Sequence, residues 1–278
     1  MTSLQFTKMH GLGNDFMVID ATRQPVTLAT KQIRALANRH RGIGFDQCLL
    51  LYPSDDPSID FQYRIFNADG GEVEQCGNGA RCLGRFVAEQ QLTTKPYVTV
   101  ATCNRRMQIQ VSAHGNIEVD MGKPHFDPAE VPFLAKDQTA PYHLDLGGET
   151  FEFYVVNVGN PHMIICVDDW QTGLISGFGL QLTQHERFPE GVNVNFMQLI
   201  DDQHIKLRVV ERGTGETEAC GSGACASAVI AQQYFGAAAR IQVELLGGMV
   251  TIHRTNEQSN IVMAGPAQTV YHGTVELS

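Results

Sequence analysis

Residues 211–225 read ERGTGETEACGSGAC, and this stretch decides the fold that we expect. Residues 67–82 repeat its form earlier in the chain as NADGGEVEQCGNGARC. Each stretch passes from a glycine-rich turn through acidic residues to a cysteine, Cys76 or Cys220, that opens a segment of helical periodicity. The two cysteines are 144 residues apart, which indicates that the chain is an internal duplication.

Other landmarks recur in the same order at nearly the same spacing. The matching pairs, whose offsets drift only from 146 to 143 residues, are Asn14 with Asn160, Gln47 with Asn193, Asn67 with Glu211, and Gly122 with Gly265. Any one pair could be a coincidence of common turn residues, but the ordered set favours duplication. We therefore expect an α+β fold of two pseudo-symmetric domains. Each domain should be a mostly antiparallel, barrel-like sheet around one central helix, with the active site in the interdomain cleft.

The pattern of apolar residues predicts the elements of each half. Helices are expected at 30–40, with Thr30 as the N-cap, and at 77–91, 173–184 and 221–235. Strands are expected at 4–10, 16–20, 46–52, 59–66, 97–102, 106–111, 116–121, 151–158, 162–167, 192–200, 204–210, 240–245, 249–254 and 260–264.

Four prolines within residues 123–141 mark the boundary between the halves. The predicted domains are therefore residues 1–122 with 267–278, and residues 123–266. The last segment, 268–278, exceeds the repeat and alternates polar and apolar residues. It is expected to return as an extra strand to the first half's sheet, or to form a subunit contact.

The composition argues against several classes of partner. The chain has 278 residues, a formal net charge of −10 and no block of Lys or Arg, so we expect no nucleic-acid partner and no membrane partner. No apolar run approaches the roughly 18 residues of a membrane span, and the N-terminus lacks the basic and apolar regions of a signal peptide. Seven cysteines, an odd number, then favour reduced thiols and a cytoplasmic location.

The cysteine spacings do not fit a metal site, and no cofactor motif is present. The chain has no Cys-x-x-Cys, and its two close cysteine pairs lack zinc-ligand spacing, so we expect no metal. It has no Gly-x-x-x-x-Gly-Lys motif, and Gly42-Ile43-Gly44 lacks the third glycine of a dinucleotide fingerprint, so we expect no cofactor. Four further cysteines are expected in the core: Cys48, Cys82, Cys166 and Cys225.

Cys76 and Cys220 each stand at the start of a predicted helix. The free N–H groups there lower the pKa of a thiol and, next to Gly-x-Gly, can bind a carboxylate. If a pseudo-two-fold axis relates the halves, one thiolate can remove an α-proton while the opposite thiol protonates the other face, which inverts a stereocentre. The alternatives are that both cysteines are structural, or that they form a redox switch in a non-catalytic protein.

Five motifs resemble those of one family. They are MHGLGNDF at 9–16, RGIGFDQ at 41–47, FNADGG at 66–71 with CGNGARC at 76–82, GNPH at 159–162, and the stretch at 211–223. From residue 4 to about residue 273 the chain resembles the diaminopimelate epimerases. The resemblance implies two similar α/β domains and a cofactor-independent interconversion of LL- and meso-2,6-diaminopimelate. That reaction serves lysine synthesis and, in most bacteria, the cell wall.

The resemblance also implies roles for particular residues. Cys76 and Cys220 are implied as the acid/base pair, assisted by His162 and Glu211. The reacting carboxylate is implied to bind at Gly77, Asn78, Gly221 and Ser222. The implied substrate site consists of Asn14, Gln47, Asn67, Asn160, Asn193, Glu211 and Arg212, with Arg212 on the distal carboxylate. Tyr271 matches a dimer-contact tyrosine, so we expect a homodimer.

Two isomerases of similar fold are the nearest alternatives. A proline or hydroxyproline racemase also uses paired thiols, but it needs no grip on a distal carboxylate. Glu211, Arg212 and the asparagine cluster favour a longer substrate with a second amino-acid end. A phenazine-type isomerase would not need both cysteines. The sequence leaves open which thiol deprotonates which stereoisomer.

Overall fold

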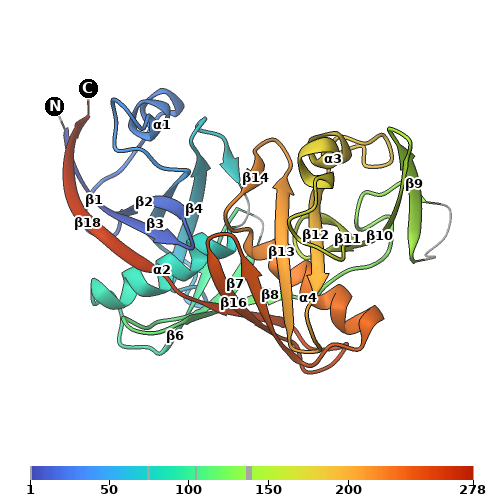
Figure 1. The fold of residues 1–278 in the computed structure, drawn as a ribbon. Coiled ribbons are helices and arrows are strands. Elements are labelled where there is room, and N and C mark those ends of the chain that lie inside the picture. The colour runs from blue at the N-terminus through green and yellow to red at the C-terminus, as the bar shows by residue number, and fades with distance from the viewer. Residues whose placement is uncertain (1, 74–75, 104, 136–139, 278) are drawn as a thin grey trace. The chain divides into compact units, whose positions relative to one another are not determined.

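The computed structural model describes residues 2–73, 76–103, 105–135 and 140–277. Its elements are strands β1 to β18 and helices α1 to α4 (Figure 1). The chain forms two compact units, Met1–Asp120 with Gly265–Ser278, and Met121–Ala264. Each unit is described by itself below, as the first unit and the second unit.

In the first unit, most neighbouring strands are antiparallel. Its strands are β1 (Thr2–Gly11), β2 (Asn14–Asp20), β3 (Gln47–Pro53), β4 (Phe61–Asn67), β5 (Glu72–Val73), β6 (Tyr97–Ala101), β7 (Arg106–Gln110), β8 (Ile117–Gly122) and β18 (Gln268–Leu277). They pair in the order β18, β1, β2, β3, β4, and β4 also pairs with β5 and with β6, which continues to β7 and β8. Only β2–β3 and β4–β6 are parallel among these pairs of described residues.

The second unit repeats this order of pairing. Its strands are β9 (Tyr142–Leu146), β10 (Glu149–Asn157), β11 (Pro161–Cys166), β12 (Asn193–Leu199), β13 (His204–Glu211), β14 (Gly215–Thr217), β15 (Arg240–Leu245), β16 (Gly248–His253) and β17 (Ile261–Gly265). They pair in the order β9 to β13, and β13 also pairs with β14 and with β15, which continues to β16 and β17. The α+β fold and the internal duplication are therefore confirmed.

Each unit is mostly antiparallel, as predicted, and the helices explain its two parallel pairs. Parallel neighbours need a crossover connection, which a hairpin cannot supply. Helix α1 (Thr30–Ala37) connects the parallel pair β2 and β3, and α2 (Gly77–Glu89) lies between β4 and β6. In the second unit, α3 (Leu174–Thr183) and α4 (Gly221–Phe235) take the same two places, between β11 and β12 and between β13 and β15.

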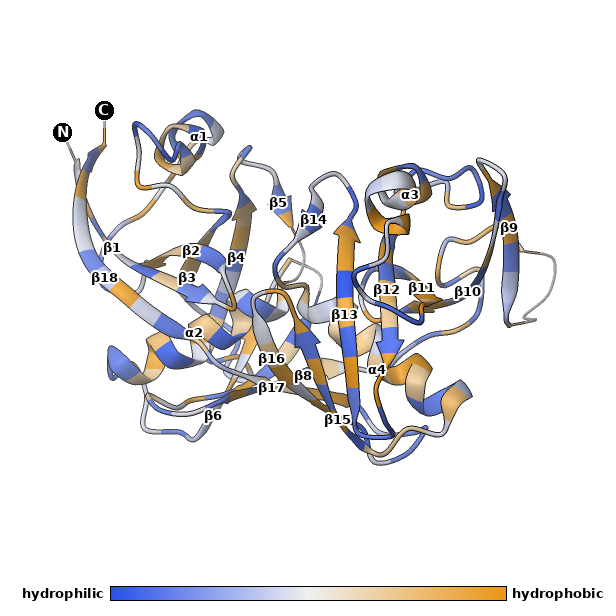
Figure 2. Cartoon of the chain, in the orientation of Figure 1, coloured by the Kyte–Doolittle hydropathy of each residue, from blue (hydrophilic) through white to orange (hydrophobic). Residues whose placement is uncertain are grey.

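The strand registers identify equivalent residues in the two units. Phe16 lies opposite Gln47 in the first unit, and His162 lies opposite Asn193 in the second. Along β13, polar and apolar residues alternate (Figure 2), and the apolar ones are buried. A strand with this period presents one face to the core and the other to solvent or to a site.

Some local predictions made from the sequence are wrong. Helix α1 begins at Thr30, and its N-cap is Ala29, whose backbone N–H is 3.0 Å from Gln32 Oε1. The short strands β5, β9 and β14 were not predicted because two or three residues of alternation, or a proline-rich approach, give too weak a pattern. Cys48, Cys82 and Cys225 are buried as predicted, but Cys166 is only partly buried.

Each unit has its own apolar core. In the first unit, Met17 and Ile19 of β2 pack in one cluster with Ile33 and Leu36 of α1. In the second unit, Phe133 stacks on Phe188 with ring centroids 4.8 Å apart. Among the described residues, no helix is long and apolar enough to cross a membrane.

Candidate active site

Cys76 and Cys220 occupy equivalent positions, each as the N-cap of its unit's central helix. Both residues have extended backbone angles, and each carbonyl accepts the first turn's hydrogen bond, from Ala80 N at 2.9 Å and from Ala224 N at 3.0 Å. The Cys76 Sγ also accepts from Gly79 N at 3.3 Å. The side chain of Cys76 is partly exposed, whereas Cys220 is buried. Helix N-termini of this kind present N–H groups that favour anions.

The third residue of each central helix has to be a glycine. A Cβ at Gly79 would lie 2.7 Å from the Tyr63 hydroxyl, and one at Gly223 would lie 2.6 Å from Asn195 Oδ1. Both oxygens are buried and have no hydrogen-bond partner among the described residues. The Gly-x-Gly spacing therefore serves close packing beneath each cysteine as well as access to backbone N–H groups.

Asn14 joins the predicted site residues of the first unit. Its Oδ1 accepts from Asn78 Nδ2 at 3.2 Å, and the Cys76 Sγ donates to the same oxygen at 3.8 Å. Its Nδ2 donates to Asp46 Oδ2 at 2.9 Å. The thiol of Cys76 thus faces the oxygen of an amide and not a charged group at this contact.

Gln47 and Asn67 form a second pair in the first unit. Gln47 Nε2 donates to Asn67 Oδ1 at 2.8 Å across the antiparallel pair β3 and β4. Gln47 Oε1 is buried and has no partner among the described residues. Buried acceptors are seldom left unpaired, so this oxygen is suited to an ammonium or amide donor of a ligand.

In the second unit, His162 is fully buried and bonded on both ring nitrogens. Asn195 Nδ2 lies 3.0 Å from His162 Nδ1, and its bonds to Met163 O and Asn193 O identify it as the donating nitrogen. His162 Nδ1 is therefore the acceptor, and His162 Nε2 carries the proton and donates to Asn160 Oδ1 at 3.0 Å. Burial lowers the pKa of His162 to about 3, and the positive charge of Arg212 acts in the same direction. His162 is thus neutral and oriented.

Glu211 and Cys220 interact with each other in the second unit. The Glu211 Oε1 accepts from Thr217 Oγ1 at 2.6 Å, and the Cys220 Sγ lies 3.5 Å from the Ser222 hydroxyl. Burial raises the pKa of the Cys220 thiol well above its ordinary value, and the carboxylate of Glu211 raises it further, against the effect of Ser222. The expectation that the helix start lowers this pKa is therefore wrong for Cys220, because desolvation and a like charge outweigh it.

Asn193 and Arg212 complete the predicted residues of the second unit. Asn193 is buried, and its Oδ1 accepts from the Arg212 backbone N–H at 3.0 Å. The Arg212 side chain is exposed and donates to the Glu190 carbonyl at 2.5 Å. Asn193 therefore fixes the backbone from which the guanidinium projects.

Each unit thus assembles part of the predicted site. Gly77 and Asn78 open α2 beside Cys76, and Gly221 and Ser222 open α4 beside Cys220. Tyr271 stands apart on the exposed strand β18, where its ring meets the Phe6 edge with centroids 5.9 Å apart. Among the described residues, no group of three or more His, Cys, Asp or Glu side chains could hold a metal ion.

Several polar residues that contact the predicted site residues, or that contact their partners, were not predicted from the sequence. They are Lys8, Asp15, Arg39, Asp46, Tyr63, Arg81 and Asn195. Asp15 and Asp46 stand next to predicted residues, Asn14 and Gln47, in the motifs at 9–16 and 41–47. That adjacency was the one available signal, since the contacts depend on pairing between strands.

A family model described as diaminopimelate epimerase matches residues 6–126 and 154–270 of the chain. The matched residues include both cysteines and cover most of each unit.

Solved structures of proteins from other families share the fold. A hydroxyproline epimerase from Agrobacterium vitis superposes with a TM-score of 0.70 at 14% identity, over 98% of this chain and 92% of that one. A probable proline racemase from Agrobacterium radiobacter gives 0.69 at 15% identity, over 99% and 93%. A phenazine biosynthesis protein of the PhzF family from Bacillus anthracis gives 0.69 at 18% identity, over the whole of both chains. At these identities the likeness extends to the fold alone.

Proposed function

The chain belongs to the diaminopimelate epimerase family, and we propose that it interconverts LL- and meso-2,6-diaminopimelate with its two N-cap cysteines as acid and base. The observation that carries the proposal is the equivalence of Cys76 and Cys220 at the starts of α2 and α4. Epimerisation at an α-carbon needs a base on one face and an acid on the other. A duplicated thiol supplies both from one kind of group.

The proposed reaction moves one proton off the substrate and another onto it. A thiolate takes the α-proton, and the C–H electron pair passes into the neighbouring carboxylate. The opposite thiol then gives its proton to the α-carbon from the other face, so one cysteine ends as a thiol and the other as a thiolate. The backbone N–H groups at Gly77, Asn78, Gly221 and Ser222 would stabilise the negative charge on the carboxylate. The proposal requires that both thiols reach one substrate.

Two neighbouring groups would tune these thiols differently. Glu211 raises the pKa of Cys220 and so makes its thiolate a stronger base, and its carboxylate is suited to accept the proton of that thiol when Cys220 acts as the base. His162 is neutral and donates to Asn160, so we assign it to orienting Asn160 and not to carrying a charge. This assignment narrows the assisting role that the family resemblance implies for His162.

The remaining polar residues suit the second amino-acid end of diaminopimelate. Arg212 is exposed and positively charged, and a planar guanidinium binds a carboxylate through two hydrogen bonds. Gln47 Oε1 is an unpaired acceptor for an ammonium group. A proline racemase, the alternative of the same fold, has no distal carboxylate to bind. We therefore favour the longer substrate.

We further propose that the protein is a cytoplasmic homodimer joined through the face that carries Tyr271. Val270 and Tyr271 of β18 are both exposed, although large apolar side chains gain by burial. Light scattering of the wild type beside Tyr271→Ala tests this, because the dimer should dissociate in the variant. A monomeric wild type would reject it.

Hydrogen exchange with the solvent tests the reaction. The wild type, Cys76→Ala and Cys220→Ala are incubated with LL-diaminopimelate in deuterated water, without added pyridoxal phosphate or metal. Deuterium uptake at the α-carbon with formation of the meso isomer, lost in both variants, supports the proposal. Uptake from proline but not from diaminopimelate would transfer the assignment to a racemase. No uptake from either would return the cysteines to a redox or structural role.

A further inference from the structure

A chain of hydrogen bonds in the first unit connects Cys76 to two charged residues. At one end, Arg81 Nη2 donates to Asn78 Oδ1 at 2.9 Å. Asn78 Nδ2 then donates to Asn14 Oδ1, and Asn14 Nδ2 donates to Asp46 Oδ2 at 2.9 Å. The Cys76 thiol meets this chain at Asn14 Oδ1.

The two ends fix which way each amide points. A guanidinium can only donate, so Arg81 must face the oxygen of Asn78 and not its nitrogen. A carboxylate can only accept, so Asp46 must face the nitrogen of Asn14. With both amides fixed, Asn14 presents its oxygen to Cys76. An acceptor at this place favours the protonated thiol over the thiolate.

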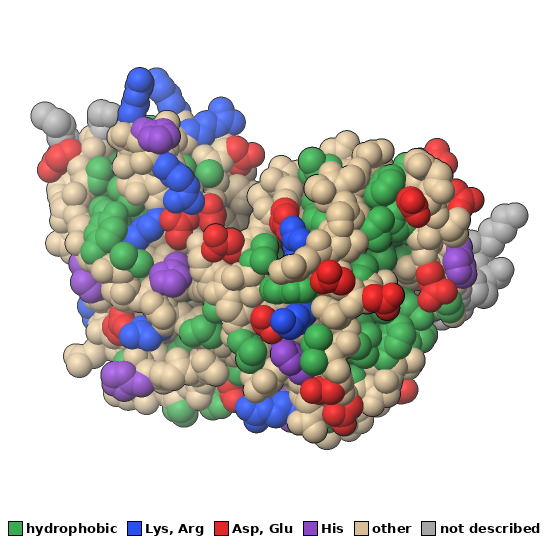
Figure 3. All heavy atoms as spheres, in the orientation of Figure 1, with side chains coloured by type: hydrophobic (Ala, Val, Ile, Leu, Met, Phe, Trp, Pro, Cys, Tyr) green, Lys and Arg blue, Asp and Glu red, His purple; other side chains and the backbone are tan. Residues whose placement is uncertain are grey.

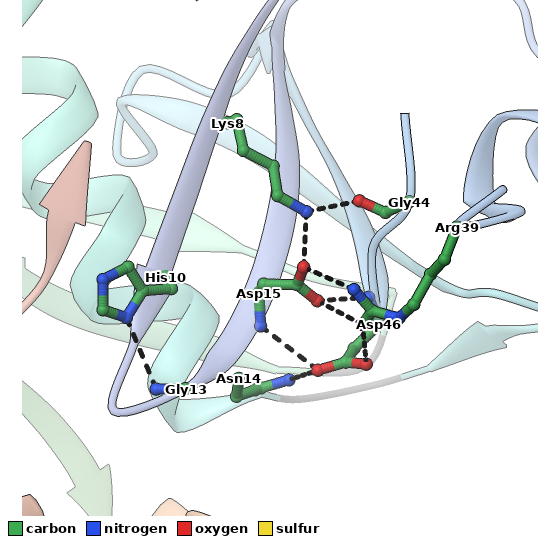
Figure 4. A network of polar contacts seen from close by, with 8 residues as sticks. All are labelled: Lys8, His10, Gly13, Asn14, Asp15, Arg39, Gly44 and Asp46. Atoms are coloured by element: carbon green, nitrogen blue, oxygen red, sulfur yellow. Dashed lines mark hydrogen bonds and ion pairs between the residues drawn. The ribbon is translucent and has the colours of Figure 1, made fainter. Parts of the chain in front are cut away.

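The Asp46 end is held by a network of ion pairs, drawn in Figure 4. Arg39 Nη2 lies 2.7 Å from Asp46 Oδ1 and 2.8 Å from Asp15 Oδ1, and Lys8 pairs with Asp15. Lys8 also donates to the Gly44 carbonyl, which precedes β3 by three residues. Basic side chains gather over α1 on this face (Figure 3), but Arg39 is committed to these carboxylates. Burial raises the pKa of Asp15, yet its bonds to Arg39 and Lys8 outweigh that and lower it to about 2.

The Arg81 end is buried inside the unit. Arg81 is fully buried, and its Nε also donates to the Pro266 carbonyl at 3.2 Å. A buried guanidinium with fixed partners cannot rotate to present another group. The chain of amides is therefore anchored at both ends by charges of opposite sign.

We propose that Asp46 is a positioning residue, which together with Arg81 orients Asn78 and Asn14 so that Cys76 is presented as a proton-donating thiol. The inference rests on the proposed function for its catalytic meaning. In that reaction one cysteine must begin as the acid, and the first unit holds Cys76 in this state before substrate binds.

Two further titratable side chains among the described residues of the first unit interact with Cys76. They are Tyr63 on β4 and Cys82 on α2. Burial raises the pKa of both groups above the ordinary value, so neither carries a charge near neutral pH. They therefore do not replace Asp46 in setting the state of the thiol.

The test is the rate at which iodoacetamide alkylates Cys76 as a function of pH, in the ligand-free protein. Trypsin releases residues 65–81, whose sole cysteine is Cys76, so mass spectrometry reads this thiol alone. In Asp46→Asn the acceptor-only anchor of Asn14 Nδ2 is lost and, among the described residues, only Asn78 still orients this amide, so an orientation with the Asn14 nitrogen toward sulfur becomes accessible. We expect the profile to move to lower pH, with alkylation about tenfold faster at a fixed pH below the thiol pKa. Asp46→Glu, which keeps an acceptor-only group, should retain the wild-type profile.

Two controls separate the hydrogen bond from charge alone. Asp15→Asn removes a carboxylate of the same network that makes no bond to Asn14, and Asp56→Asn removes one that pairs with Arg106 elsewhere in the unit. Both should leave the Cys76 profile close to that of the wild type. A shift in Asp15→Asn as large as in Asp46→Asn would assign the effect to charge, and an unchanged profile in Asp46→Asn would equally overturn the proposal. Should Asp46→Asn not fold, Asp46→Ala removes the same acceptor and is judged by the same profile.

An activity measurement keeps this inference apart from the proposed function. If the wild type epimerises diaminopimelate, the thiol limb of the pH profile of kcat/KM should move in Asp46→Asn by the same amount as the alkylation profile. If the wild type incorporates no deuterium, the proposed function fails, while the alkylation profile still decides whether Asp46 positions the thiol.

Discussion

Each unit orients an equivalent asparagine, but the first unit uses a charged acceptor and the second a neutral donor. Asn14 and Asn160 are equivalent, since each lies two residues before equivalent positions, Phe16 and His162, in the matched strands β2 and β11. In the first unit, Asn14 is held by the carboxylate of Asp46, within a partly exposed network of ion pairs. In the second unit, Asn160 is held by a neutral, fully buried histidine.

This difference shows what duplication preserves and what it leaves free to change. The order of strand pairing and the N-cap position of each cysteine are the same in both units. The groups around the thiols are not, because Cys76 meets an amide oxygen whereas Cys220 lies beside the carboxylate of Glu211. If both thiols reach one substrate, as the proposed reaction requires, that substrate would meet two chemically different thiols.

The largest effect is expected when either thiol is removed. Cys76→Ser and Cys220→Ser should each lower kcat/KM for diaminopimelate by about 10²- to 10⁴-fold, because a serine hydroxyl is a far weaker base and acid near neutral pH. If the two act as one unit, the double variant should lose little more than the worse single variant. Steady-state assays of the three variants measure this. Near-wild-type activity in either single variant would show that the two thiols are not a pair.

A second comparison replaces His162 with phenylalanine, the residue that stands at the equivalent position 16 of the first unit. The pKa of His162 is about 3 in the folded protein and about 6.5 when unfolded, so between these values the unfolded chain binds more protons. The free energy of unfolding should therefore fall as the pH is lowered from about 6.5 toward 3, by about 1.4 kcal/mol per pH unit from this group. His162→Phe should lack this contribution, so its stability should approach that of the wild type as the pH falls.

Urea unfolding at several pH values between 7 and 4 measures the difference between the two proteins. His114→Asn, at an exposed turn, controls for the loss of one histidine and should keep the wild-type dependence on pH. If the free energy of unfolding depends on pH in the same way in the wild type and in His162→Phe, His162 is not held neutral by burial. A neutral histidine would then no longer distinguish the second unit from the first.

The sequence predicts the shared features of the units better than their differences. Helix periodicity and the repeated motifs place Cys76 and Cys220 at helix starts, because these signals are local or recur at a fixed spacing. The bond from Asn195 to His162 joins residues 33 positions apart, and it depends on the parallel register of β11 and β12. A periodic pattern does not contain that register, so these partners could not be predicted.

The direction of the pKa shift of the Cys220 thiol could not be predicted from the sequence either. A helix start predicts a lowered pKa for both cysteines, yet burial and Glu211 raise the pKa of Cys220. Burial is set by how α4 packs against the sheet, and α4 contacts strands from residue 149 to residue 253. Tertiary packing therefore decided an effect that local geometry had predicted with the opposite sign.

The smallest effect is expected from the carboxylate that distinguishes the second unit. Because Glu211 raises the pKa of Cys220, Glu211→Gln should lower that pKa, and alkylation of Cys220 should become about tenfold faster at a fixed pH below it. Thr217 can still donate to the amide oxygen of the substituted side chain, so the fold of the hairpin should persist. Glu216→Gln, which removes a carboxylate of β14 that pairs with Arg208, is the matched control and should leave Cys220 unchanged. If the two variants alkylate alike, Glu211 does not act on the thiol directly, and the chemical difference between the units would rest on burial alone.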